Sequence, residues 1–141
     1  MTTASDFREI YRYNWRVLRD FCDALSKLPP EALVASADSA IREKDFDEVQ
    51  SMDELRGYME KIIAKEERFL TKLKDKDLDR GVQPEWKTRP HPLRDALLQV
   101  TFEQAHHLGE LIALFWQQDV EPPEMTWIDV RLAIAGDPGP S

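Results

Sequence analysis

The chain has 141 residues with 27 acidic and 19 basic side chains, so its formal net charge is −8. This length suits one domain, and a composition that is 42% hydrophobic and 33% charged can bury a core, which excludes a disordered chain. The negative charge repels phosphate backbones and disfavours nucleic acid as a partner, and a single cysteine, Cys22, excludes an internal disulfide or a cysteine-rich zinc site.

Neither a membrane span nor a leader is expected. The uncharged apolar runs are only a few residues long, too short to cross a bilayer. The first seven residues, Met1 to Phe7, have no basic region followed by an apolar region, as a secretory signal would. We therefore expect a cytoplasmic protein with no membrane partner, folded as one domain over residues 1–141, with residues 136–141 as a flexible tail.

Apolar residues at helical spacing predict the first two helices. The first begins after Ser5, a plausible N-cap, and ends at the Pro29-Pro30 break. Residues 31–50 give only a weak helical signal. The segment Ser51 to Glu54 has the Ser-x-x-Glu pattern of a capping box and predicts the start of a second strong helix that extends to about Leu73.

The second half of the chain predicts two further helices. Residues 74–90 are charged and interrupted by glycine and proline, which indicates an ordered connection that carries Trp86. A third strong helix follows Pro92 to about Gln118, and residues 126–135 predict a short terminal helix. No segment alternates with period two, so the pattern favours an all-α, up-down helical bundle.

The third strong helix carries the most informative polar pair. Glu103 and His107 fall on the same stripe as Val100, Leu111 and Leu114, so we expect a carboxylate and an imidazole to point together into the bundle. Their i, i+4 spacing is the geometry that a metal requires from a helix. The alternative is a hydrogen-bonded Glu–His pair in a core without metal.

Other residues could complete a site. Asn14 and Glu66 interrupt the apolar stripes of the first two helices and are expected to face inward, although an amide that ties helices together or a simple ion pair would explain them equally. His106 points about 100° away from His107 and fits packing or an interface better than ligation. His91 is expected in a solvent-facing turn.

An apolar ligand pocket is a weaker hypothesis. Aromatic walls with a few polar groups are typical of binding clefts. The candidates here are Trp15, Tyr58, Trp86 and Trp116, which core or interface packing would also explain.

Two segments resemble a known family. The run from Glu103 to Glu110, Glu-Gln-Ala-His-His-Leu-Gly-Glu, with the Pro122-Pro123 stop behind it, is similar to the last core helix of the DinB/YfiT-like superfamily. The Tyr13-Asn14 region resembles that family's opening helix, and residues 51–80 resemble its third helix. The resemblance implies an all-α bundle, usually a homodimer, with a divalent metal held by three histidines. Relatives include bacillithiol-dependent thiol transferases and mycothiol-dependent maleylpyruvate isomerases.

The chain departs from that family in two places. Glu103 stands where the family has its first histidine on this helix, while His107 matches the second. The interval between the first two strong helices has no histidine, and residues 36–48 are too short for the family's second core helix. We therefore expect that helix to be short or supplied by the partner in a homodimer.

Two functions follow from this pattern. The first is a metal-dependent enzyme, a thiol transferase or a hydrolase, in which Glu103 and His107 hold zinc, nickel, iron or manganese and a low-molecular-weight thiol attacks a small-molecule substrate. The second is a non-catalytic dimeric bundle that acts as a binding or stress-response module.

Overall fold

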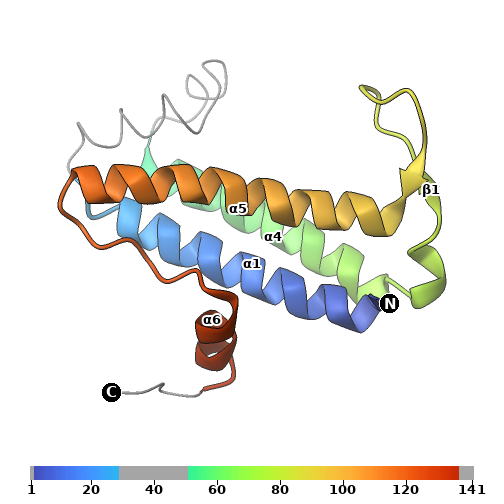
Figure 1. Ribbon diagram of the computed structural model, residues 1–141, viewed down its shortest axis with the longest axis horizontal. Helices are drawn as coiled ribbons and strands as arrows, with labels where there is room; N and C mark the ends of the chain where they lie inside the picture. Colours follow the sequence, from blue (N-terminus) through green and yellow to red (C-terminus); the bar gives the residue numbers. More distant parts are fainter. Residues whose placement is uncertain (1, 29–50, 137–141) are drawn as a thin grey trace.

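Helices dominate the computed structural model, which describes residues 2–28 and 51–136. In this part of the chain, three long helices lie side by side and a short one packs against the first of them. They are α1 (Ala4–Leu25), α4 (Met52–Lys72), α5 (Leu93–Gln117) and α6 (Trp127–Ile134). Helices α1 and α5 run in the same direction and α4 runs against them (Figure 1). The predicted all-α bundle is confirmed. The predictions for residues 31–50 and for the tail after Gly136 lie outside the described residues.

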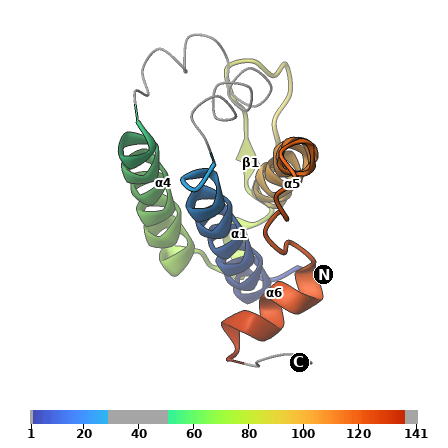
Figure 2. The same ribbon diagram turned by 90° about the vertical axis from the view of Figure 1, so that its left-hand side faces the viewer.

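Helix α1 is the common packing partner of the other helices. It contacts α4, α5 and α6, and it lies between α4 and α5 in the end-on view of Figure 2. Two apolar clusters are distributed along it. Phe7 and Tyr11 belong to one cluster, whereas Val17 and Phe21 belong to the other, with Leu108 and Phe115 of α5. The α1 residue between them, Asn14, is polar and buried.

The two long helices before the connection begin at side-chain caps. In α1 the Asp6 N–H donates to Thr3 Oγ1 at 3.1 Å and the Thr3 N–H donates to Asp6 Oδ2 at 2.9 Å. This reciprocal pair satisfies two backbone donors and makes Thr3 the N-cap. The predicted cap, Ser5, is therefore wrong. Ser51 is confirmed as the N-cap of α4, because its hydroxyl accepts from the Glu54 N–H at 3.1 Å.

The connection from α4 to α5 is more structured than the sequence indicated. It holds the 3₁₀ turn η1 (Asp75–Asp77) and two short antiparallel strands, β1 (Gly81–Val82) and β2 (His91–Pro92). No strand was expected, because two-residue strands are too short to show alternation. His91 lies in β2 and is half-buried, so its assignment to a solvent-facing turn is wrong.

The start of α1 is bound to the end of α4. The Arg8 guanidinium donates to the Leu70 and Leu73 carbonyls at 3.0 and 3.2 Å, and the Ala4 N–H donates to Asp75 Oδ1 at 2.8 Å. A cation at a helix C-terminus satisfies carbonyls that lack partners in the helix and complements the helix dipole. These bonds fix the relative position of the two helices along their axes. None of the helices within residues 2–28 and 51–136 is long and apolar enough to cross a membrane.

The second apolar cluster provides a test of the packing. Phe115 is fully buried. Its ring packs edge to face against the Phe21 ring, with the two ring centroids 5.9 Å apart. We expect Phe115→Ala to lower the free energy of unfolding by about 3–5 kcal/mol, because it leaves a cavity in the core. Phe102, on the same helix, is 63% exposed and provides the matched control. Phe102→Ala should change stability by about 0.5 kcal/mol or less in urea denaturation, and equal losses for the two variants would contradict this packing.

Candidate metal centre and interior polar contacts

Helix α5 carries polar residues on two neighbouring faces that differ in burial. Thr101 and Gln104 lie on the inward face and are half-buried, whereas the side chains of Glu103 and His107 are 55% and 52% exposed. Successive residues of a helix are rotated by about 100° about the helix axis. A set of positions that lies one residue away from the inward stripe therefore faces solvent instead of the core. The prediction that Glu103 and His107 point into the bundle is therefore wrong. The true inward stripe comprises Leu93, Leu97, Thr101, Gln104, Leu108, Leu111 and Phe115.

Four side chains on the exposed face form what we call the His–Glu cluster: Glu103, His106, His107 and Glu110. His107 lies between two carboxylates, with Nε2 3.6 Å from Glu103 Oε2 and Nδ1 3.6 Å from Glu110 Oε2. His106 Nε2 lies 3.2 Å from Glu110 Oε1, so Glu110 faces both imidazoles. Gln99 Nε2 donates to Glu103 Oε1 at 2.7 Å and orients that carboxylate.

The donor set of this cluster suits a divalent transition metal. One ligand atom from each of His106, His107 and Glu110 lies within 4.8 Å of the others. Imidazole nitrogen with carboxylate oxygen suits zinc, nickel, iron or manganese. Ligand atoms around a tetrahedral zinc lie about 2.0–2.2 Å from the ion. To bind one ion, the ligand atoms of His106, His107 and Glu110 must therefore move closer to one another. Exposed side chains on one helix are free to make this adjustment. The residues therefore fit a metal ion.

The sequence did not single out Glu110 as a ligand. Its signal was present, since Glu110 stands four residues after His106 and three after His107, the two spacings that bring side chains together on a helix. The sequence pattern favours His107 over His106 as a ligand, because His106 lies about 100° further around the helix. On an exposed face both imidazoles reach the same carboxylate, which the inward assignment did not anticipate.

Asn14 connects α1 to the inward face of α5. Its side-chain Nδ2 donates to Thr101 Oγ1 at 3.0 Å, and Gln104 Nε2 donates to the backbone carbonyl of Asn14 at 3.1 Å. Thr101 in turn donates to the Leu97 carbonyl at 3.2 Å. Asn14 is only 2% exposed, and among the described residues its Oδ1 has no hydrogen-bond partner. Asn14 thus faces inward as predicted, as an amide that ties two helices together.

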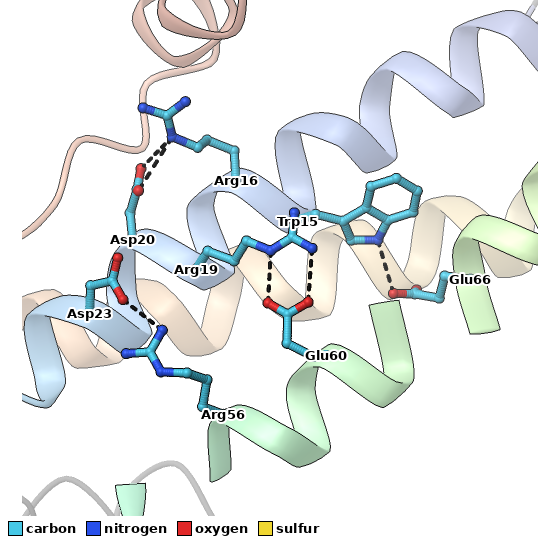
Figure 3. A network of polar contacts seen from close by, with 8 residues as sticks. All are labelled: Trp15, Arg16, Arg19, Asp20, Asp23, Arg56, Glu60 and Glu66. Atoms are coloured by element: carbon cyan, nitrogen blue, oxygen red, sulfur yellow. Dashed lines mark hydrogen bonds and ion pairs between the residues drawn. The ribbon is translucent and has the colours of Figure 1, made fainter. Parts of the chain in front are cut away.

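Glu66 connects α4 to α1. Its Oε1 accepts from Trp15 Nε1 at 3.2 Å (Figure 3). Glu66 is half-buried, and desolvation raises the pKa of its carboxyl group, although the bond from Trp15 opposes the shift. Tyr11 is buried beside it and donates to the Leu97 carbonyl at 2.9 Å. Desolvation first, and the Glu66 charge second, raise the pKa of the Tyr11 hydroxyl. Glu66 and Asn14 have partners of their own and do not join His107.

The remaining candidates are dispersed. Trp86, Trp116 and Tyr58 are 79%, 57% and 60% exposed, so they do not form the aromatic pocket considered from the sequence. Cys22 is a buried free thiol, and desolvation raises its pKa. A buried thiol with a raised pKa holds little thiolate near neutral pH and is a poor nucleophile.

The fold and site together define an all-α helical bundle with an exposed histidine and glutamate cluster on one long helix. Residues 8–111 match the family model of the DinB superfamily. Because this match spans most of the chain and includes most of α1, all of α4 and the His–Glu cluster, the chain belongs to the DinB superfamily. Neither the curated proteins nor the solved structures give a significant match.

The raised pKa of Glu66 generates a stability prediction. A carboxyl group whose pKa is higher in the folded state favours folding at low pH, and this contribution is lost as the pH rises through the folded pKa. Glu66→Gln keeps an acceptor for Trp15 and removes the ionisation. The unfolding free energy of the variant, relative to that of the parent protein, should therefore increase between pH 4 and pH 7.

Urea denaturation at both pH values measures this difference. Glu67→Gln is the matched control, because Glu67 is the exposed neighbour of Glu66 on α4. A relative stability that stays constant with pH for Glu66→Gln, or that rises equally for the two variants, would contradict the burial of Glu66.

Proposed function

We propose that the protein is a metal-dependent member of the DinB superfamily whose His–Glu cluster holds one divalent cation. The observation that carries this proposal is the convergence of His106, His107 and Glu110, whose ligand atoms lie within 4.8 Å of one another. Glu103 would act beside them as a fourth donor, or as the carboxylate that orients the His107 ring, the role that neighbouring carboxylates often have at metal sites.

A thiol-dependent transfer reaction on a small molecule in the cytoplasm is the activity that we propose for this centre. A bound cation would lower the pKa of a coordinated thiol or water and so supply a nucleophile near neutral pH. The chain's own thiol is unsuited to this role, since Cys22 is buried. The nucleophile would therefore come from a low-molecular-weight thiol, which an exposed centre admits without any opening of the bundle.

Metal binding is tested by calorimetric titration of the chelator-treated protein with zinc, nickel, iron(II) and manganese. We expect one ion per chain for at least one of these metals, and His107→Ala should weaken its binding by about tenfold or more, because one of three ligands is lost. His91→Ala is the matched control, since His91 lies in β2 away from the cluster. An absence of binding to all four ions, or equal losses in the two variants, would contradict the proposal.

A non-catalytic dimeric bundle, acting in binding or in a stress response, is the second candidate. The observation that favours it is the exposure of large apolar side chains, since Ile62 and Phe69 of α4 and Val100 of α5 are 39%, 41% and 48% exposed. A second copy of the chain would cover these side chains in a homodimer.

Light scattering tests the dimer. We expect a mass near twice the 16.4 kDa of one chain, and Ile62→Glu should shift it toward one chain, whereas Lys61→Glu, at the exposed neighbouring position, should not. A single-chain mass at every concentration would remove this candidate and leave the metal proposal unaffected.

A further inference from the structure

A small pocket lies on the outer face of α1, away from the His–Glu cluster. Its volume is about 260 Å³, and its lining is strongly basic for a chain of net charge −8: Arg12, Trp15, Arg16, Arg19 and Ile134. Four of these residues belong to α1 and the fifth to α6. The Arg131–Glu9 ion pair, at 3.3 Å, holds α6 against α1 and so places Ile134 at this pocket.

The three arginines differ in how far their charges are already paired. Arg19 donates to both oxygens of Glu60 at 2.9 Å, so its guanidinium is held in place (Figure 3). Arg16 reaches Asp20 through Nε alone, at 3.2 and 3.3 Å, which leaves its terminal amino groups without a partner in the described part of the chain. Arg12 has no ion pair with any described residue. Arg12 and the terminal amino groups of Arg16 are therefore the guanidinium donors of this pocket that no carboxylate of the described residues engages.

The rest of the lining is apolar. The indole N–H of Trp15 is engaged by Glu66, so the ring offers its carbon surface, and Ile134 is half-buried. A guanidinium binds the two oxygens of a carboxylate with well-matched geometry, and apolar walls favour a ligand with an apolar body. The volume lies just below the range of about 300–1,000 Å³ that is usual for ligand pockets, which limits the ligand to a small one.

We propose that this pocket binds a small monocarboxylate with an apolar body. The carboxylate lies between Arg12 and the terminal amino groups of Arg16, one helical turn apart, and the body packs against Trp15 and Ile134. The apolar walls at Trp15 and Ile134 favour a carboxylate with an apolar body over inorganic phosphate, which has none. The site shares no residue with the His–Glu cluster and does not depend on metal binding.

Benzoate is the first test ligand, followed through the indole N–H signal of Trp15 in two-dimensional NMR spectra. We expect a saturable shift that fits one site. Arg12→Gln should weaken benzoate binding by about tenfold, which is the loss of one charge-assisted contact. Arg89→Gln is the matched control, because Arg89 is exposed in the connection before α5 and its substitution removes the same charge. Arg89→Gln should leave the affinity unchanged.

Further ligands test the two halves of the site. Acetate should bind more weakly than benzoate, and Ile134→Ala should weaken benzoate binding while leaving acetate binding nearly unchanged, because only benzoate has a body that reaches this side chain. A linear, non-saturating shift, or equal losses in Arg12→Gln and Arg89→Gln, would overturn the site. Tighter binding of inorganic phosphate than of benzoate at the same Trp15 signal would overturn the monocarboxylate assignment.

Discussion

The contact of Asn14 with Thr101 and Gln104 determines how α5 is oriented in this protein. An amide that is almost fully buried between two apolar clusters is costly unless it is hydrogen-bonded, and α5 supplies the partners of Asn14. When Thr101 and Gln104 turn toward α1, Leu97 and Leu108 enter the two apolar clusters on either side. The rotation of α5 about its own axis is thereby fixed, and so is the direction in which each of its other polar residues points.

The exposed His–Glu cluster is a consequence of that rotation. Glu103 and His107 lie one position away from the inward stripe, and His106 and Glu110 lie further around the helix. All four residues come from one helix and need no second element to bring them together. A centre of this kind is open to exogenous ligands, whereas the interior contacts of Asn14 and Glu66 stabilise helix pairs. The outer face of α1 carries a third polar region. There, arginines of α1 and α4 form ion pairs with carboxylates of the same two helices.

The helices were predictable from the sequence because apolar spacing and caps are local signals. Ser51 and the Pro122-Pro123 stop gave correct boundaries to within a few residues, while Thr3 displaced Ser5 because the reciprocal bond with Asp6 decides between adjacent caps. The orientation of Glu103 and His107 was not predictable, since Val100 and Leu114 share their stripe and suggested a buried face. Val100 is in fact 48% exposed. The burial of Leu97 and Leu108 in the apolar clusters, together with the contact through Asn14, distinguishes the two stripes.

The location of a bound metal tests the account most directly. Crystals grown with zinc and measured at the zinc absorption edge would give an anomalous difference peak at each bound ion. The account predicts one peak per chain on the exposed face of α5, within bonding distance of His106, His107 and Glu110. A peak in the interior between Asn14 and Glu66, with the α5 imidazoles unliganded, would contradict it.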